Sequence, residues 1–335
     1  MEPVQETSSP LDRPASRASL RELAAAGLLS PEAQDAALHW LEPRRDWWGW
    51  TSRALLFLGA ALALSGIVFF FAYNWAAMAP FLKFAILETA VLGAAVAAWK
   101  VGFDRLGGKV LLLSASFLVG VLLAVYGQVY QTGADAWELF AGWAALILGW
   151  VLVSRFAALW IMELALVYFA AILYWGQVRQ SEGAGLFVLL ALLAGGLHVA
   201  FEAGARRGVD GLRPAWPRAL LWTATLTDLT IGTGILIFDP GYAGGAGWAA
   251  AALLLAALAA GYGWYRHRAP SLPSLTAGAA ALSTAILMLA GRLIFEQTFE
   301  AAAFFAYGII ILAVIGGAVL GLRRISRSME VSVDD

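Results

Sequence analysis

Residues 54–73 read ALLFLGAALALSGIVFFFAY, a run of twenty residues without a charged side chain. A helix needs about 20 apolar residues to cross the hydrocarbon core of a bilayer, so this run has the length and composition of one membrane span. The whole chain has a similar composition: of its 335 residues, 61% are apolar and 13% are charged. Soluble domains average about 45–50% apolar and about 25% charged residues. The sequence therefore predicts an integral membrane protein and excludes an ordinary soluble enzyme and a disordered chain.

Nine further apolar runs follow the first. They cover Phe81–Trp99, Val110–Tyr130, Trp137–Val153, Phe156–Trp175, Gly185–Glu202, Ala219–Phe238, Trp248–Tyr265, Leu275–Phe295 and Ala301–Leu322. Their lengths suit α-helices rather than the strands of an outer-membrane barrel, which alternate over about 10 residues. We therefore expect an all-α, polytopic bundle of about ten transmembrane helices.

The positive charges test this count of spans. If residue 1 lies in the cytoplasm, sixteen Lys and Arg residues flank the spans on the cytoplasmic side, and three lie on the opposite side. The three are Arg179, Lys83 and Arg292. Cytoplasmic loops carry an excess of Lys and Arg, so this bias predicts that both termini are cytoplasmic. Adding or removing one span would destroy the bias.

The predicted domain organisation has six parts. They are a disordered tail at 1–18, a cytoplasmic helical hairpin with an interfacial anchor at 19–50, six membrane helices at 51–203, a basic Gly-rich cytoplasmic linker at 204–218, four membrane helices at 219–322, and a cytoplasmic tail at 323–335. Trp47, Trp48 and Trp50 supply the anchor, because amphipathic aromatic rings prefer the headgroup level.

The N-terminal hairpin carries helix-end signals. Ser19 and Glu22 have the spacing of a capping box. Gly27 suits the end of that helix, and Ser30 followed by Pro31 suits the start of a second one. Two short helices cannot bury enough surface to be stable alone, so we expect the hairpin to dock. It is either a packing appendage of the membrane domain or a module that binds a cytoplasmic partner.

Small residues recur at helical spacing. The pairs Gly59 and Gly66, Gly120 and Gly127, and Gly142 and Gly149 are seven residues apart, and Gly317 and Gly321 are four apart. Such pairs lie on one helix face and let neighbouring helices approach closely. We expect them to pack within the bundle; the alternative is a seam between two copies of the chain.

Four segments of the first half resemble a known family. They are GLLSPE at 27–32, AYNW at 72–75, GQVYQTGAD at 127–135, and Trp143. Together they resemble the bacterial membrane protein family called domain of unknown function 2157, over roughly residues 19–165. The resemblance implies a protein of the bacterial cytoplasmic membrane. It supplies no reaction, substrate or catalytic residue, and the second half carries no family signature.

Ionisable side chains within the apolar runs are the first candidates for a functional site, since each is costly inside a bilayer. They are Asp228, Glu163, Glu88 and His198. Asp228 is the deepest, and Thr223, Thr227 and Thr230 are expected to share a stripe beside it that faces protein or water. The acids form either a cation or proton pathway or structural hydrogen bonds and ion pairs between helices.

A second candidate is a polar cluster near the outer ends of the helices. Its members are Tyr73, Asn74, Trp75, Lys83, Gln128, Tyr130, Gln131, Asp135, Glu138, Arg292 and Glu296. Charges of both signs with amides and aromatic rings suit an outward-facing pocket for a small polar ligand, a sugar or a lipid headgroup. Interfacial anchoring explains the aromatic residues equally well, but anchoring does not require amides.

Several function classes lack their residues. The chain has no cysteine and a net charge of −1, which exclude disulfides and argue against nucleic acid as a partner. The three histidines lie on separate segments, so we expect no metal site and no cofactor. The leading hypothesis is transport or binding of a small polar solute or ion, with proton coupling through Asp228 or Glu163. The alternatives are an intramembrane enzyme acting on a lipid or lipid-linked substrate, and a non-catalytic scaffold or sensor that acts through its N-terminal hairpin. The oligomeric state is left open.

Overall fold

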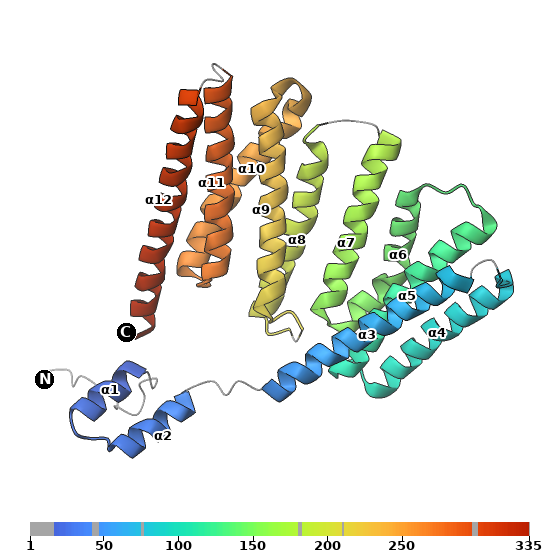
Figure 1. Ribbon diagram of the computed structural model, residues 1–335, viewed down its shortest axis with the longest axis horizontal. Coiled ribbons are helices and arrows are strands. Elements are labelled where there is room, and N and C mark those ends of the chain that lie inside the picture. Colours follow the sequence, from blue (N-terminus) through green and yellow to red (C-terminus); the bar gives the residue numbers. More distant parts are fainter. Residues whose placement is uncertain are drawn as a thin grey trace, which may run out of the picture. The chain divides into compact units, whose positions relative to one another are not determined.

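A computed structural model describes residues 17–41, 47–74, 77–179, 183–209, 211–296 and 301–334. These residues form twelve α-helices, and none of them lies in a strand (Figure 1). Ten of the helices are long and apolar enough to cross a membrane. Nine of the ten predicted runs lie within one of them, and the run Phe156–Trp175 begins one residue before the fifth span, so the predicted all-α, multi-span fold class is confirmed.

The helices follow one another with short connections. They are α1 (Arg17–Ala25), α2 (Pro31–Leu41), α3 (Trp47–Asn74), α4 (Pro80–Val101), α5 (Leu106–Tyr130), α6 (Ala136–Ser154), α7 (Ala157–Tyr174), α8 (Gly185–Arg206), α9 (Ala215–Phe238), α10 (Pro240–His267), α11 (Leu272–Phe295) and α12 (Ala301–Asp334). A single π-helical turn, η2 (Trp175–Arg179), continues α7. The α8–α9 connection contains part of the segment predicted as a linker; the division into six and four helices stays a prediction.

The chain divides between Gly59 and Ala60 into two compact units. In the first unit, α1 and α2 pack against each other. The Ser30 hydroxyl accepts a hydrogen bond from the Ala33 amide, as its predicted capping role requires, and Gly27 adopts a positive φ of 70° at the end of α1. The predicted capping box is wrong, because α1 already begins at Arg17 and Ser19 lies inside it.

In the second unit, consecutive helices pack in pairs. The contacts join α4 with α5, α6 with α7, and α8 with α9, while α9 also contacts α7, α10 and α11. One apolar cluster gathers residues of α4–α7 and a second gathers residues of α8–α12. Four helices surround α9, and 61% of its apolar segment is therefore buried. This is the largest fraction among the ten candidate spans of the described chain. A polar residue on the buried face of α9 therefore meets protein rather than lipid.

Each cluster seats a tryptophan on a glycine. The Trp143 ring of α6 lies against Gly120 of α5, and its indole N–H donates to the Ser116 carbonyl at 2.7 Å. The Trp222 ring of α9 lies against Gly261 of α10, and its N–H donates to the Ser274 carbonyl at 3.1 Å. A Cβ at either glycine would collide with the ring. Both rings are thus held by a close helix–helix approach and by a hydrogen bond.

The other glycine pairs behave differently from the expectation. A Cβ would meet no described atom within 4 Å at Gly59, Gly66, Gly142, Gly149, Gly317 and Gly321, and Gly127 has one ordinary contact with Thr132. Packing within the bundle is therefore the right explanation for Gly120 and the wrong one for the five open positions of the second unit, and it stays a prediction for Gly59, which belongs to the first unit. A seam between copies of the chain stays a prediction for them.

Candidate functional site

Asp228 lies in the middle of α9 on its buried face, with 7% of its surface exposed. The predicted threonine stripe is wrong in part: Thr223 and Thr227 are exposed, and Thr230 is buried. Successive residues of a helix turn by about 100°, so Thr227 points well away from its neighbour Asp228. Thr225, which is buried, lies on the face of Asp228 and donates to the Leu221 carbonyl of its own helix.

Tyr168 connects Asp228 to two other helices. Its hydroxyl lies 2.8 Å from Asp228 Oδ2 and 2.8 Å from the carbonyl oxygen of Leu190, so α7, α8 and α9 meet at this one group. The hydroxyl has a single proton to give. Among the described residues, no Lys, Arg or His forms an ion pair with Asp228. The carboxyl group is therefore buried with a neutral partner and without a countercharge.

The two other predicted acids are placed differently. Glu163 lies on α7, five residues before Tyr168, and its Oε2 atom is buried without a hydrogen-bond partner among the described residues. Glu88 lies on α4, and its side chain is exposed. The structure thus places Asp228 where α7, α8 and α9 meet. It places Glu163 on the face of α7 that carries Leu159 and Leu166 of the α4–α7 cluster, and it leaves Glu88 exposed on α4.

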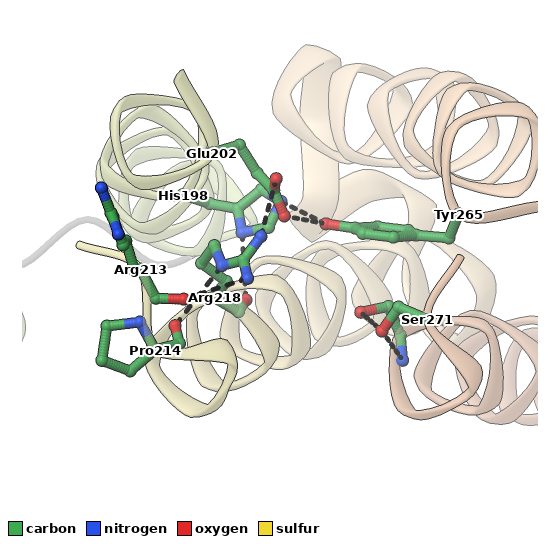
Figure 2. A network of polar contacts seen from close by, with 8 residues as sticks. His198, Glu202, Arg213, Pro214, Arg218, Tyr265 and Ser271 are labelled. Atoms are coloured by element: carbon green, nitrogen blue, oxygen red, sulfur yellow. Dashed lines mark hydrogen bonds and ion pairs between the residues drawn. The ribbon is translucent and has the colours of Figure 1, made fainter. Parts of the chain in front are cut away.

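His198, the fourth predicted residue, belongs to a second buried network (Figure 2). Its Nε2 atom lies 2.7 Å from the Tyr265 hydroxyl, and its Nδ1 atom lies 3.0 Å from the Arg218 carbonyl oxygen. Glu202, one turn further along α8, accepts from Tyr265 at 3.2 Å and pairs with Arg218 at 3.1 Å. The network therefore joins α8, α9 and α10 at the end where α8 ends and α9 begins.

Protons are limiting in this second network. A carbonyl oxygen can only accept, so His198 must donate from Nδ1 to Arg218. The single hydroxyl proton of Tyr265 then faces two acceptors, His198 Nε2 and Glu202 Oε1. One additional proton, placed on His198 Nε2, would let both contacts be hydrogen bonds. The network can therefore take up one proton without rearranging its heavy atoms.

Three members of this network were missed from the sequence. Glu202 and Tyr265 lie at the ends of predicted runs, and Arg218 lies in the predicted linker, so each passes for an ordinary residue at a helix end. A usable signal was the spacing of His198 and Glu202, which are four residues apart and hence on one helix face. Nothing in the sequence pairs that face with Arg218 or Tyr265.

The predicted outer cluster is distributed over several helices. Tyr73 and Asn74 end α3, Lys83 is buried near the start of α4, and Gln128 and Tyr130 are exposed on α5. Gln131, Asp135 and Glu138 are exposed around the α5–α6 connection, and Trp75 lies outside the described residues. Arg292 of α11 pairs with Glu296, the residue after the end of that helix, and α11 packs against α9, α10 and α12. A pocket shared by these residues stays a prediction.

Two residues of the predicted outer cluster, Asn74 and Tyr130, contact side chains or carbonyls of their own helix or of a neighbouring helix. The Asn74 amide donates to the Phe70 carbonyl of α3. The rings of Phe84, Tyr126 and Tyr130 form an aromatic group between α4 and α5, with the Phe84 and Tyr130 rings stacked at 5.8 Å. This arrangement secures the ends of the two helices.

Comparison with known families bears on the first half of the chain. Residues 21–160 match the family described as "Predicted membrane protein (DUF2157)". This is the suspected family. The DUF2157 match covers less than half of the chain and, with the ten apolar helices, supports a multi-pass membrane protein of unknown function. Neither the curated proteins nor the solved structures contain a match to the chain.

Proposed function

We propose that the chain binds and transports a small polar solute or an ion across the bacterial cytoplasmic membrane, with Asp228 as the group that exchanges a proton. The observation that carries the proposal is the contact between Asp228 and Tyr168 at the meeting point of α7, α8 and α9. A carboxyl group inside a membrane helix is costly, and such groups commonly mark ion or proton pathways.

The hydrogen-bond inventory favours a protonated Asp228. A bare carboxylate at this site would be buried without a cation, which is strongly unfavourable. A protonated carboxyl group can donate to the Tyr168 oxygen, and Tyr168 can then donate to the Leu190 carbonyl. All three groups are satisfied in this arrangement.

Loss of that proton would change which helices Tyr168 connects. The ionised carboxylate would draw the Tyr168 proton to itself, because hydrogen bonds to charged acceptors are stronger. Tyr168 would then bond α9 and release the Leu190 carbonyl of α8. Proton release is thereby linked to a change in the contacts between α7, α8 and α9, which is the kind of two-state element that coupled transport requires. Glu163, whose buried Oε2 atom has no hydrogen-bond partner among the described residues, is proposed as a second proton-exchanging group, on the face of α7 toward the α4–α7 cluster.

The positive charges support the proposed orientation. In α8–α12, the α8–α9 and α10–α11 connections and the end of α12 lie at one end of the helices, and the other connections lie at the opposite end (Figure 1). The first end carries Arg206, Arg207, Arg213, Arg218, Arg266, Arg268, Arg323, Arg324 and Arg327. Such an excess favours a cytoplasmic location for this end.

Cysteine labelling tests the proposal, because the chain has no native cysteine. Thr225→Cys places a thiol on the buried face of α9, and Thr227→Cys places one on the exposed face of the same helix two residues away. Each variant is treated with a small, cationic, membrane-impermeant thiosulfonate in sealed vesicles of either orientation. A thiol surrounded by lipid does not ionise and does not react, so we expect labelling at Thr225→Cys and little at Thr227→Cys.

A third variant, Arg207→Cys, reports that the reagent reaches the exposed loop. If Arg207→Cys reacts while Thr225→Cys stays unlabelled from both sides, no aqueous path reaches the face that carries Asp228. That result would contradict transport through α7–α9.

A further inference from the structure

A cavity of about 410 Å³ opens at the arginine-rich end of α8, α9 and α10. Its charged lining consists of Arg206 at the end of α8, Arg213 and Arg218 around the start of α9, Arg268 after α10, and Glu202. Ligand pockets commonly measure about 300–1,000 Å³, so the cavity has room for a small molecule or a headgroup. Four cationic side chains and one anionic side chain give it a strong positive potential.

The one carboxylate of the cavity is already engaged. Glu202 pairs with Arg218 through Oε2 and accepts from Tyr265 through Oε1 (Figure 2). Arg218 in turn donates to the carbonyl oxygens of Pro214 and Arg213. Arg218 and Glu202 therefore compensate each other at the buried base of the cavity, and neither charge needs an external partner.

Arg206 and Arg268 form no ion pair with the described part of the chain. The guanidinium carbon of Arg206 lies 3.5 Å from the centre of the Trp264 ring, a stacked position that orders the side chain and leaves the donors at its edge available. Arg268 forms no hydrogen bond or ion pair with the described part of the chain. The cavity is thus lined by Arg206, whose side chain is ordered by stacking, and by Arg268, whose charge is not compensated within the described part of the chain.

We propose that this cavity binds a phosphate-bearing anion, either the headgroup of an anionic phospholipid or a small soluble phosphate compound. Guanidinium groups match phosphate with paired, charge-assisted hydrogen bonds. Basic pockets between transmembrane helices on the cytoplasmic side are suited to phospholipid headgroups. Arg206 is the principal anchor, since its position is fixed before binding and less entropy is lost when the anion arrives.

The generic excess of arginine at cytoplasmic helix ends does not account for this arrangement. Arg207 and Arg266 lie at the same helix ends as Arg206 and Arg268 but do not line the cavity, and Arg266 donates to Ser328 of α12 at 2.8 Å. Orientation of the chain needs only the number of charges. Convergence of four guanidinium groups on a cavity with a compensated base is an additional feature.

The cavity is separate from the proposed proton site. Arg218 and Asp228 are ten residues apart on α9, which corresponds to about 15 Å along the helix. Asp228→Asn should therefore leave anion binding unchanged, so failure of one proposal would be distinguishable from failure of the other.

Thermal unfolding of the purified full-length chain in nanodiscs tests the inference. The first arm uses discs of phosphatidylcholine with added inorganic phosphate or pyrophosphate, and with chloride at equal ionic strength as the control. The second arm uses discs in which phosphatidylglycerol or, as a phosphate-free anion, oleate replaces part of the phosphatidylcholine. The variants are Arg206→Gln and Arg268→Gln, with Arg207→Gln as the matched loss of one charge outside the cavity.

We expect the midpoint of unfolding to rise with phosphate-bearing anions and not with chloride or oleate. A response in the first arm identifies a soluble phosphate compound, and a response confined to phosphatidylglycerol identifies a lipid headgroup. Arg206→Gln and Arg268→Gln should each raise the half-saturating anion concentration about tenfold, the usual effect of losing a charge-assisted contact. Equal responses in all three variants, or an equal response to oleate, would overturn the proposal.

Discussion

Helices α4–α6 and α8–α10 each pack a tryptophan ring against a glycine of a neighbouring helix, but they bury very different polar groups. In α4–α6 the buried polar side chains of the described chain are Lys83, Ser116 and Ser154, and both serines donate to carbonyls of their own helix. In α8–α10 they are His198, Glu202, Thr225, Asp228, Thr230 and Thr233. The first group is an apolar framework, and the second contains two networks that run between helices.

The family match covers the first helix group, and the two buried networks lie outside it. The match spans residues 21–160 and includes Glu88 and the aromatic and amide residues at the ends of α3 and α5. Every side chain that joins the two buried networks lies beyond it, from Tyr168 to Tyr265. The family resemblance therefore informs about the framework, while the candidate chemistry lies in the part of the chain that the family model does not cover.

The largest effect is expected from breaking the ion pair of the second group. Arg218→Leu leaves the Glu202 carboxylate largely buried without its cation, so the free energy of unfolding should fall by about 3 kcal/mol. Unfolding in mixed micelles with increasing denaturing detergent measures the change. The double variant Glu202→Gln with Arg218→Leu should recover part of the loss; a loss equal to the sum of the single variants would show that the pair is not coupled.

The shared tryptophan device provides the next test. Gly120→Ala and Gly261→Ala both place a methyl group against a buried indole ring, so each should lower the free energy of unfolding by about 1–3 kcal/mol. Gly142→Ala and Gly149→Ala are the matched controls, since a Cβ at either position meets no described atom. The controls should be neutral or slightly stabilising, because alanine is the better helix former. Equal effects in all four variants would contradict the proposed packing.

A smaller effect is expected from removing one hydroxyl group. Tyr168→Phe deletes the bond from α7 to Asp228 and Leu190, and it should cost about 1 kcal/mol in the same unfolding measurement. Tyr130→Phe removes the same hydroxyl from an exposed residue of α5 and should cost much less. A cost at Tyr130 that matches the cost at Tyr168 would remove the distinction between the two helix groups.

The smallest effect is expected for the exposed polar residues of the matched region. Gln128→Ala and Glu88→Gln change side chains that the structure leaves exposed, so the free energy of unfolding should shift by no more than about 0.5 kcal/mol. Thermal unfolding in detergent is sufficient to detect a larger shift. A loss of 2 kcal/mol or more for either variant would mean that a partner or a second copy of the chain covers these positions.

The sequence predicted the parts of the fold that depend on local pattern. Ten runs of sufficient length and hydropathy correspond to ten helices, because spanning a membrane imposes one length and one composition on each helix. The Ser30 cap and the Gly27 helix end followed from local chemistry in the same way. Ser19 failed because Arg17 and Ala18 are good helix formers and the helix continues through them.

The site was less predictable, because it depends on which helices are neighbours. Asp228 and His198 were identified by the cost of burying them, but Tyr168, Arg218 and Tyr265 come from other helices and look ordinary in isolation. The threonine stripe was misassigned because several threonines occur on α9, and spacing alone does not say which face is covered by α8, α10 and α11. Spacing alone also did not show which face of α4 is covered. That helix packs on α5 through another face, and the Glu88 side chain is exposed.

Infrared difference spectroscopy of the carboxyl groups tests the central claim most directly. The claim is that Asp228 is protonated in the core of α7–α9, where its Oδ2 atom lies 2.8 Å from the Tyr168 hydroxyl. The full-length chain in nanodiscs at neutral pH should show the carbonyl stretch of a protonated carboxyl group, shifted in heavy water, and Asp228→Asn should remove the component of that band that belongs to Asp228 while the chain stays folded. The same band in Asp228→Asn, or its absence from the wild-type chain at neutral pH, would contradict the account.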